Sequence, residues 1–540
     1  MLKCRIHQLL LPLDYRESDI LPAAAAKLYC AQTVLAELTI LRRSVDARPR
    51  QAGPLFSLTI DITVNLSTLP RSFPENEVQI IIPEQQPKPL YPVRKATTQF
   101  KNPVVIGAGP AGLFAALALA KSGLKPIVIE RGAVVEQRAG HVQQFWGHGI
   151  LNPESNVLYG EGGAGLFSDG KLTARSKDKP RIRWLFENLV ECGAPENILI
   201  DAEPHIGSDS LLKIIPELRN RILALGGEFR FNTRCTGLLV TENHIAGIYI
   251  NDGELLPVNH CVLATGHSAR DMYHILLQNH VPLEPKPFAV GLRLEIPQEQ
   301  VDRAQWGKYA GHPRLEAASF RLTRRSENEA RPCYSFCMCP GGVVIPCASS
   351  DGEMTTNGMS FSSRAGLFAN AAFLVPVTPD DYNENTGAQN HVLAGHLFQA
   401  GIERKAFLTG GSNYYLPASR LTDFLAGSKP KTLPQARSWQ NSIPADIHTL
   451  LPKFINQTLV SAIPKMLREL NGVPIEDALL YGVETRSSSP VRMVRNTEDG
   501  QSPGIGGLFP AGEGSGYAGG IVSSAIDGMK AAEFICREID

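Results

Sequence analysis

The sequence predicts an α/β protein in which a domain with a parallel sheet is interrupted by an inserted α+β domain and preceded by a small α+β domain. A strand, a glycine turn, a helix and a second strand follow one another from Asn102 to Glu130, which is the pattern of a βαβ unit. The proline-rich tract Pro83–Pro92 separates this unit from the N-terminal segment and is typical of a linker. Strand and helix patterns return between Gly506 and Glu538 after a long turn-rich stretch. We therefore expect four segments, with boundaries at residues 1–95, 96–280, 281–480 and 481–540.

The composition is that of a folded protein with several cores. The 540 residues are 43% hydrophobic and 20% charged, and this length suggests about three or four structural units. The 53 basic residues balance the 53 acidic ones, so no overall field would attract nucleic acid or an anionic membrane. We expect a small-molecule substrate as partner, neither membrane nor nucleic acid, and leave the oligomeric state open.

The N-terminal sequence and the cysteines indicate a cytoplasmic protein. The first residues lack an apolar run followed by a small-residue cleavage site. The most apolar long stretch, Ile20–Ile40, contains Lys27, Gln32 and Glu37 and does not read as a membrane span. Ten cysteines spread over the chain form no disulfide framework, as expected in a reducing compartment.

Residues 1–95 are expected to form the small α+β domain. Their apolar patterns predict strands at Cys4–Leu11, Leu55–Asn65 and Val78–Ile82, and a helix within Ile20–Leu35. A basic cluster lies between them at Arg42, Arg43, Arg48 and Arg50. Because the cluster contains Asp46 and no interleaved aromatic residues, we expect a solvated loop there rather than an RNA contact.

Three glycines form a dinucleotide-binding turn in the segment from residue 96 to residue 280. Gly107 permits the tight turn, Gly109 lets the backbone approach a pyrophosphate, and Gly112 lets the helix Leu113–Lys121 pack on the sheet. The helix N-terminus offers unpaired N–H groups to the phosphates. Glu130 ends the next strand, 23 positions after Gly107, where a carboxylate can accept both hydroxyls of the adenosine ribose. This Rossmann-like turn alone suits FAD and NAD equally.

The pattern continues with a helix at Leu211–Leu225, strands within Phe229–Asn251 and a buried strand at Cys261–Ala264. Two segments at its ends favour FAD. Ala264-Thr265-Gly266 resembles the segment that passes the cofactor in the glutathione-reductase superfamily of flavoproteins. Gly507–Glu513, with the glycine-rich run to Val522, resembles the last FAD motif of that superfamily. The resemblance implies that Glu513 meets the ribityl or pyrophosphate region and that a helix starting near Gly520 aims its N-terminus at the isoalloxazine, where reduction places negative charge.

Further segments resemble a family usually labelled FAD-dependent dehydrogenase or NAD(FAD)-utilising dehydrogenase, and the resemblance covers most of the chain after residue 100. The segments are Gly160–Leu172, Ala264–Asp271, Lys286–Arg293, Phe336–Gly342 and Val483–Arg492, with a weaker match at Arg42–Arg48. One departure is Ile296, where a histidine is expected, which puts a substrate role of that segment in doubt. The motifs together give the expected cofactor-binding residues: Gly107, Gly109, Pro110, Ala111, Gly112, Glu130, Arg131, Gly165, Ser168, Asp169, Lys171, Ala264, Thr265, Gly266, Gly512, Glu513, Gly519, Gly520 and Ile521.

A second dinucleotide turn, which the disulfide-reductase branch uses for NAD(P)H, is missing from the sequence. NAD(P)H would then visit as a transient substrate, without a domain of its own. The insertion at residues 281–480 would cover the reactive face of the flavin and select the substrate.

Four residues are candidates for a catalytic role: Arg293, Cys339, Arg486 and Tyr517. A guanidinium could bind a substrate carboxylate or stabilise reduced-flavin charge, although salt bridges between domains explain the arginines equally well. Tyr517 and His267 flank glycine turns and could donate to the ring, and for His267 we favour a structural hydrogen bond.

Four cysteines gather at positions 333, 337, 339 and 347. Their spacing lacks the paired geometry of common zinc sites, so we assign no metal and favour a structural role. If Phe336–Cys339 is a strand, Cys337 and Cys339 share one face, and a redox role beside the flavin stays open.

The leading hypothesis is an FAD-dependent oxidoreductase that transfers a hydride between an organic substrate and the flavin, with NAD(P)H as donor or acceptor. Two alternatives remain. The flavin could be mainly structural or regulatory, with a macromolecular partner such as RNA, or the Cys337/Cys339 pair could make the protein a flavin-linked thiol oxidoreductase.

Overall fold

A computed structural model describes residues 1–48, 53–81, 90–93, 101–173, 176–325, 331–387, 391–471 and 473–539. Most of the expected linker Pro83–Pro92 lies outside these residues, as does Arg50. Within the described residues the fold is α/β, with a parallel sheet for the dinucleotide, a second large sheet and a small N-terminal sheet. No helix among the described residues is long and apolar enough to cross a membrane.

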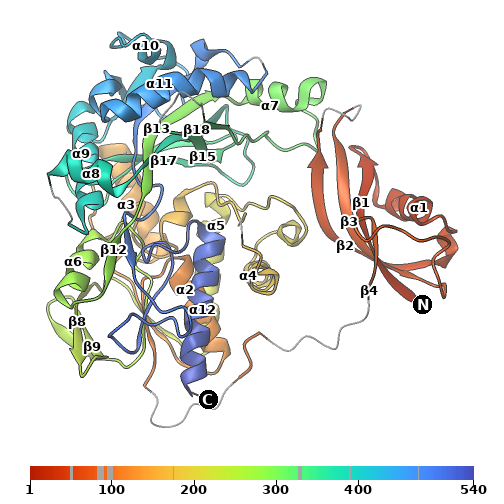
Figure 1. The fold of residues 1–540 in the computed structure, drawn as a ribbon, viewed down its shortest axis with the longest axis horizontal. Coiled ribbons are helices and arrows are strands. Elements are labelled where there is room, and N and C mark those ends of the chain that lie inside the picture. The colour runs from red at the N-terminus through yellow and green to blue at the C-terminus, as the bar shows by residue number, and fades with distance from the viewer. Residues whose placement is uncertain are drawn as a thin grey trace.

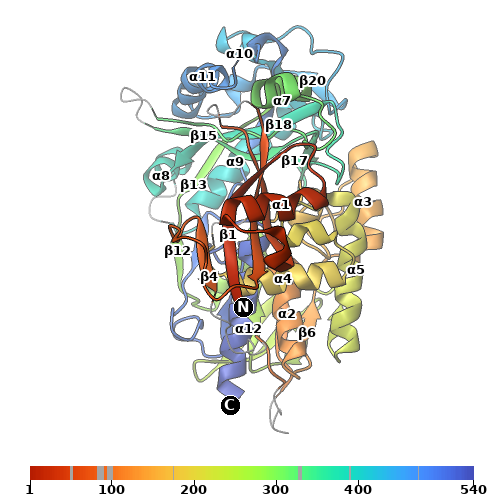
Figure 2. The ribbon, with the colours of Figure 1, turned by 90° about the vertical axis from the view of Figure 1, so that its right-hand side faces the viewer.

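The N-terminal unit is a four-stranded antiparallel sheet in the order β2-β3-β1-β4. One face carries α1, whose Ala24 and Leu28 pack against Ile6 and Ile60 in a core of its own. Figures 1 and 2 show α1 on the side of the sheet turned away from the rest of the molecule. The elements are β1 (Leu2–Pro12), α1 (Glu17–Leu28), η1 (Gln32–Val34), β2 (Leu35–Asp46), β3 (Leu55–Val64) and β4 (Val78–Ile81).

The expected solvated loop at Arg42 and Arg43 is wrong, because both residues belong to β2. β2 is an edge strand and carries polar side chains toward solvent. These side chains interrupt the alternation of apolar and polar residues by which a strand is recognised in a sequence. Arg43 also joins two domains: its amide donates to Ile200 O at 2.7 Å, its carbonyl accepts from Ala202 N at 2.8 Å, and its guanidinium binds Asp201.

The central unit is a five-stranded parallel sheet in the order β23-β11-β5-β6-β7. Strands from both ends of this domain, which are about 400 residues apart, meet in it, since β23 pairs with β11, which pairs with β5. The two helices α2 and α12 lie side by side against it (Figure 1). The elements are β5 (Val104–Ile106), α2 (Pro110–Lys121), β6 (Ile127–Ile129), β7 (Glu228–Arg230), β11 (Cys261–Leu263), β23 (Leu508–Pro510) and α12 (Ile521–Ile539).

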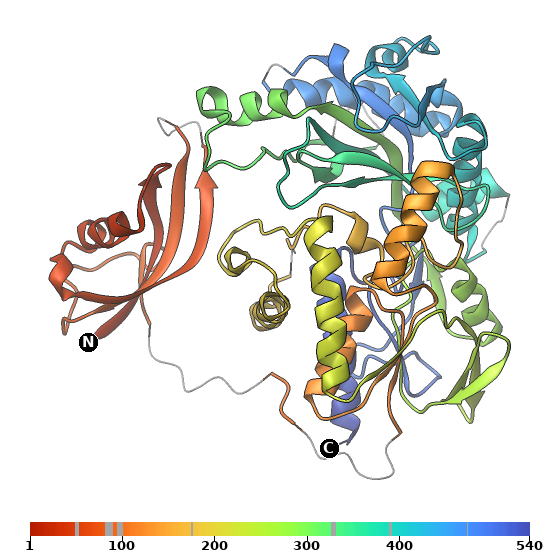
Figure 3. The same cartoon turned by 180° about the vertical axis from the view of Figure 1, so that it is seen from behind.

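Further helices and a three-stranded antiparallel sheet, β10-β9-β8, complete this domain, and Figure 3 shows α3 and α5 from behind. The predicted helix at Leu211–Leu225 is confirmed as α5, and the strands within Phe229–Asn251 as β7, β8 and β9. The elements are α3 (Val135–His148), η2 (Ala164–Phe167), α4 (Lys179–Glu191), η3 (Glu196–Leu199), α5 (Ser208–Ala224), β8 (Cys235–Thr241), β9 (His244–Ile250), β10 (Glu254–Pro257) and α6 (Arg270–Gln278).

The insertion is built on a seven-stranded mixed sheet in the order β14-β15-β18-β13-β21-β19-β20. Its central strand β13 pairs with β18 over ten residues and with β21 on its other side. The strands are β13 (Phe288–Pro297), β14 (Thr323–Arg324), β15 (Cys333–Cys339), β18 (Phe368–Val377), β19 (Leu416–Arg420), β20 (Ser442–Pro444) and β21 (Leu479–Glu484).

Two strand pairs and several helices flank this sheet. The antiparallel pair β12 (Leu283–Pro285) and β22 (Val491–Met493) joins the insertion to the central unit. A second pair consists of β16 (Val343–Cys347) and β17 (Thr355–Met359). The helices are α7 (Gln298–Trp306), η4 (Gly307–Tyr309), α8 (Pro379–Thr386), α9 (Ala394–Thr409), α10 (Leu421–Leu425), η5 (Ile447–Thr449), α11 (Lys453–Arg468) and η6 (Ile475–Asp477).

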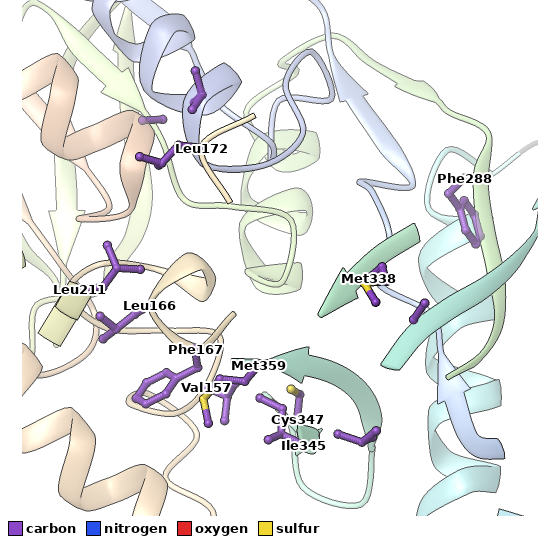
Figure 4. Packing of buried hydrophobic residues seen from close by; sticks show 14 of the residues in the cluster. Val157, Leu166, Phe167, Leu172, Leu211, Phe288, Met338, Ile345, Cys347 and Met359 are labelled. Atoms are coloured by element: carbon purple, nitrogen blue, oxygen red, sulfur yellow. The ribbon is translucent and has the colours of Figure 1, made fainter. Parts of the chain in front are cut away.

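One hydrophobic core runs through the insertion and the helix-covered face of the central sheet. Figure 4 shows part of this packing, in which Phe167 and Val157 of the central unit lie close to Met359, with Ile345 and Cys347 of β16 nearby. The two domains are therefore packed on each other through apolar side chains, and the site lies where their loops meet.

Candidate functional site

The glycine turn has the close backbone packing that its sequence predicts. Gly107 has φ +103°, and a Cβ there would lie 2.5 Å from the carbonyl oxygen of Ala264. A Cβ on Gly112 would overlap the carbonyl oxygen of Gly107. A Cβ on Gly109 would meet only the Cα of Gly163, at an ordinary 3.6 Å. The first and third glycines therefore serve packing, whereas Gly109 has room beside its backbone. The helix α2 begins at Pro110, three residues earlier than the sequence predicts.

Four segments that are far apart in the sequence meet at this turn. A Cβ on Gly163 would lie 2.9 Å from the Cα of Gly109, and one on Gly512 would lie 2.7 Å from the Cβ of Ala111. A Cβ on Gly514 would lie 2.5 Å from the carbonyl oxygen of Gly266. These close approaches require glycine and bring the backbones of all four segments together.

The N-terminus of α12 lies at the same place. A Cβ on Gly165 would lie 3.0 Å from Ile521 at the start of α12 and 3.9 Å from the ring of Pro110 at the start of α2. The first N–H groups of each helix lack intrahelical partners and carry partial positive charge. A Cβ on Gly266, Gly519 or Gly520 would meet nothing within 4 Å. A cradle of backbone donors with open space beside these glycines fits the pyrophosphate and ring of a flavin dinucleotide.

The carboxylate of Glu130 is bound to the backbone around the turn. It accepts from Ala108 N at 2.8 Å, from Gly132 N at 2.9 Å and from Gly160 N at 3.2 Å. Only 6% of the residue is exposed. Glu130 thus fastens the turn to the loop after β6, at the position expected for a ribose contact. Arg131 beside it binds Glu154 and Asp271 and lies over the ring of Tyr159.

The loop with Ser168, Asp169 and Lys171 connects the two domains. Ser168 donates to Gly165 O at 2.7 Å, within the loop. Asp169 forms a buried ion pair with Arg364 of the insertion, and the ammonium of Lys171 donates to the carbonyl oxygen of Met338. The side chains of Asp169 and Lys171 therefore face the insertion, while the loop backbone lies at the cradle.

Three polar groups lie beside Gly266. The hydroxyl of Thr265 is buried without a partner among the described residues. Burial raises the pKa of Glu513 to about 7, against the lowering effect of nearby Lys286. His267 Nε2 lies 3.9 Å from Glu513 Oε1. Burial, together with Arg486 and Arg270, lowers the pKa of His267 to about 3, so this imidazole stays neutral at physiological pH.

A substrate role for Arg293 is not supported, because its five N–H groups all have partners. Its side chain is fully buried in the insertion sheet. Two N–H groups bind Glu484 at 2.9 and 3.0 Å, and the others reach Asn370, Asn357 and the carbonyl oxygen of Cys337. This arginine stabilises the sheet.

Arg486 belongs to a buried cluster of charges between the domains. It binds Glu403 of α9 through two hydrogen bonds at 2.8 and 3.0 Å and donates to Ser268 and Ser349. Arg270 of α6 binds Glu403 and Glu353. The two arginines hold the pKa of the fully buried Glu403 far below its usual range, against the effect of burial.

Arg270, Glu353 and Glu403 are not among the site residues predicted from the sequence, although Arg270 lies within the segment Ala264–Asp271 that carries the family resemblance. No local signal marks Glu403, which lies 133 residues from Arg270 within an ordinary helical pattern. Tyr517, the remaining catalytic candidate, is 41% exposed. Its ring lies under the guanidinium of Arg495 at 4.1 Å. Tyr517 is therefore an accessible side chain and not a buried acid.

The expected shared face of Cys337 and Cys339 is wrong, because β15 has a bulge between Phe336 and Cys339. Cys337 takes φ +44° and is exposed, whereas Cys339 is buried. Burial raises the pKa of Cys339 to about 12, which disfavours the reactive thiolate. No disulfide joins cysteines within the described part of the chain, which also contains no group of three or more metal-binding side chains.

Comparison with known proteins identifies the domains. Residues 101–276 match the pyridine nucleotide-disulphide oxidoreductase family, and residues 287–487 match the family described as FAD-dependent protein, C-terminal domain-like. Residues 3–63 match a domain of unknown function. FAD is therefore the cofactor, and the chain is an oxidoreductase. These matches do not place the chain within the glutathione-reductase superfamily specifically.

Solved structures are more distant. A flavin-dependent brominase, Bmp2 in triple-mutant form, is 13% identical with a TM-score of 0.36, over 81% of this chain and 80% of that one. A geranylgeranyl bacteriochlorophyll reductase-like protein from Thermoplasma acidophilum is 11% identical with a TM-score of 0.36, over 81% of this chain and 78% of that one.

A much nearer relative is an uncharacterised protein from Clostridium beijerinckii. It is 38% identical over 552 aligned positions, which cover 99% of each chain. The chain therefore belongs to the family of this clostridial protein, with an FAD-dependent oxidoreductase architecture.

Proposed function

We propose that the protein transfers a hydride between a small organic substrate and FAD, and that NAD(P)H visits as electron donor or acceptor. When bound, the flavin supplies the redox chemistry, and the protein supplies position, exclusion of water and electrostatics. The observation that carries the proposal is the meeting of two helix N-termini, at Pro110 and Ile521, with the glycine backbones of four segments.

Each part of the cradle has a role in this proposal. The backbone at Gly109 and the start of α2 would hold the pyrophosphate, and Glu130 at the end of β6 would face the adenosine ribose. The start of α12, next to Gly519 and Gly520, would face the ring edge on which reduction places negative charge. Of the remaining expected cofactor residues, those in the segments that meet at the turn would line the cradle: Ala111, Gly165, Ala264, Thr265, Gly266, Gly512 and Glu513. The side chains of Asp169 and Lys171 face the insertion instead, Arg131 binds Glu154 and Asp271, and Ser168 donates within its own loop.

The sheet topology supports a transient role for NAD(P)H. The described residues contain a single all-parallel sheet, β23-β11-β5-β6-β7, and a single glycine turn on it. A pyridine nucleotide would therefore have to bind where the insertion meets the flavin domain, and its ring would stack on the flavin directly.

Glu513 could hold or release a proton during turnover. Its pKa of about 7 allows both protonation states near neutral pH, as acid–base groups require. Lys286, whose own pKa is lowered by burial, lies near enough to bias that equilibrium. His267 stays neutral and supplies no positive charge.

The proposal is tested by anaerobic mixing of the purified yellow protein with NADH and, separately, with NADPH. We expect one nucleotide to bleach the flavin's visible absorbance in a single phase, because a hydride carries both electrons together. Cys337→Ser should be bleached to the same extent and serves as the control for thiol involvement. If neither nucleotide bleaches the flavin of a protein that dithionite reduces fully, NAD(P)H is not its redox partner.

A further inference from the structure

The chain passes between the flavin domain and the insertion through the antiparallel ribbon of β12 and β22 (Figure 1). In this ribbon Glu284 lies opposite Arg492. Lys286 extends the pairing, because its amide donates to Pro490 O at 2.9 Å. Side chains two positions apart on one strand share a face of the ribbon, as do directly opposite residues. Lys286, which lies opposite Pro490, is therefore on the same face as Arg492.

This face borders the segment that precedes α12. A Cβ on Gly516 would lie 3.0 Å from the Cα of Arg492, so the two backbones are in contact. The next residue, Tyr517, has its ring centre 5.2 Å from the guanidinium carbon of Arg492. Gly519 and Gly520, at the helix N-terminus that we expect to face the flavin, follow after one more residue. The side chain of Arg492 is thus held beside the flavin-facing end of the cradle.

Arg492 has open hydrogen-bond donors. No atom among the described residues accepts a hydrogen bond from its guanidinium. Its Nε is buried, but the residue is partly exposed and its two terminal nitrogens remain accessible. Glu284 across the ribbon is exposed and forms no ion pair with Arg492 within the described ranges. By contrast, Arg495 on the same tyrosine ring binds Asp527 at 2.6 and 2.9 Å. The terminal nitrogens of Arg492 are therefore available to a ligand.

Lys286 also has no carboxylate within salt-bridge distance in the part of the chain that the structure describes. Its ammonium donates to two neutral oxygens, Ser488 Oγ at 3.1 Å and Ser489 O at 3.5 Å. Burial and the positive charge of Arg492 lower the pKa of Lys286, against the opposite effect of Glu513. Two like charges at this distance repel each other, and a bound anion would offset their repulsion.

We propose that Lys286 and Arg492 bind the carboxylate of an organic substrate beside the flavin. The terminal nitrogens of Arg492 form a planar fork that fits a carboxylate, and the ammonium of Lys286 adds a second positive charge. The ring of Tyr517 is 41% exposed and offers an apolar surface to the carbon part of the substrate, which favours an organic carboxylate over free phosphate. This inference rests on the proposed hydride transfer and names the substrate class of that same site.

Benzoate tests the site, since it joins one carboxylate to one flat ring. Its affinity for the FAD-bound protein is measured by calorimetry at fixed pH and ionic strength, because salt screens such contacts. Benzamide, which has the same shape without the charge, and inorganic phosphate, which has no ring, are measured beside it. The variants are Arg492→Gln and Lys286→Met. The control is Arg303→Gln, which removes an exposed positive charge of the insertion.

We expect benzoate to bind at least about ten-fold more tightly than benzamide or phosphate. Arg492→Gln should weaken benzoate binding about 10- to 100-fold, the effect of losing charge-assisted hydrogen bonds, and Lys286→Met about three- to ten-fold. Neither variant should change the affinity for benzamide, and Arg303→Gln should leave all three affinities unchanged. Benzoate should also shift the flavin's visible absorbance, because its charge would lie near the ring.

Equal affinities for benzoate and benzamide would overturn the proposal, as would tighter binding of phosphate, no binding of benzoate, an unshifted flavin spectrum or unchanged benzoate affinity in Arg492→Gln. If Arg492→Gln does not fold, unchanged benzoate affinity in Lys286→Met overturns it instead. These measurements need no turnover. A flavin that neither NADH nor NADPH bleaches would contradict the proposed function and leave benzoate binding intact, whereas failure of benzoate to bind would leave bleaching by a nucleotide unaffected.

Discussion

Gly109 and Gly112 stand three residues apart in one turn, but a methyl group on each would have different consequences. At Gly109, φ is −79° and the nearest atom is 3.6 Å away, so alanine fits the protein itself. At Gly112, the methyl group would overlap the carbonyl oxygen of Gly107. We predict that Gly109→Ala folds with nearly unchanged stability but purifies with little FAD, whereas Gly112→Ala loses stability.

Flavin absorbance per protein and thermal unfolding by circular dichroism measure these two effects. Gly140→Ala is the matched control, since a Cβ there meets nothing within 4 Å in α3, and it should retain both FAD and stability. A Gly109→Ala protein with one FAD per chain would show that the pyrophosphate does not approach this backbone.

His267 makes stability depend on pH in a defined direction. Its pKa is about 3 in the folded protein and about 6.5 in an unfolded chain, so between these values the unfolded state binds more protons. Stability from this group is therefore lost as the pH falls below about 6.5. At pH 5 the loss is about 2 kcal/mol. Wild type should lose that much more stability than His267→Asn between pH 7.5 and pH 5, measured by urea unfolding, and parallel losses would contradict the burial of a neutral histidine.

At the scale of single residues, the glycines of the dinucleotide-binding turn were predictable from the sequence, but the partners of the charged residues were not. Glycine positions follow from a local turn, whose spacing is visible in the chain. The partners of Arg293 and Arg486 come from segments more than 40 residues away, and no spacing rule reveals them. The sequence therefore marks Arg293 and Arg486 as candidates, but it does not distinguish a catalytic role from a structural salt bridge.

The helix α12 is the element whose orientation bears most on the flavin. Its N-terminal dipole favours negative charge, an effect of about 0.3–1 kcal/mol. Gly519 precedes it, and a side chain there would meet nothing within 4 Å. We predict that Gly519→Asp lowers the flavin midpoint potential by about 10–20 mV relative to Gly519→Asn, because about 30 mV corresponds to 1.4 kcal/mol for two electrons. Equal potentials from spectroelectrochemical titration would place the ring away from this terminus.

Strand prediction succeeded for buried strands and failed at an edge. The strands at Cys261–Leu263 and Ile127–Ile129 are apolar on both faces, which makes them recognisable from the sequence. The edge strand β2 has a mixed period, because Arg42 and Arg43 interrupt its apolar residues and two bulges shift its register. Its partner outside the sheet, Asp201, lies in another domain.

In the whole molecule, Glu403 links the two large domains through Arg270 and Arg486. All three side chains are at most 8% exposed. Glu403→Gln removes the negative partner and leaves two buried guanidinium groups, so we predict a loss of about 3–5 kcal/mol in unfolding free energy. Glu299→Gln, which breaks the exposed pair with Arg303, should cost less than about 1 kcal/mol. Similar denaturation midpoints for the two variants would show that the cluster does not hold the domains together.

The α/β class and the return of the chain to the same sheet were predictable, because the first and last segments of the flavin domain carry recognisable motifs. The packing of the insertion against the flavin domain was not, since it depends on contacts such as Asp169 with Arg364 that join residues with no sequence relation. The attachment of the N-terminal sheet through Arg43 belongs to the same class of contact.

The central claim is that one FAD lies between the N-termini of α2 and α12, held by both ends of the flavin domain. A crystal structure of the FAD-bound protein tests this most directly. We predict the pyrophosphate against the backbone of Gly109 and the isoalloxazine edge against Gly519 and Gly520. A flavin ring bound elsewhere, with these glycines facing only solvent, would contradict the account.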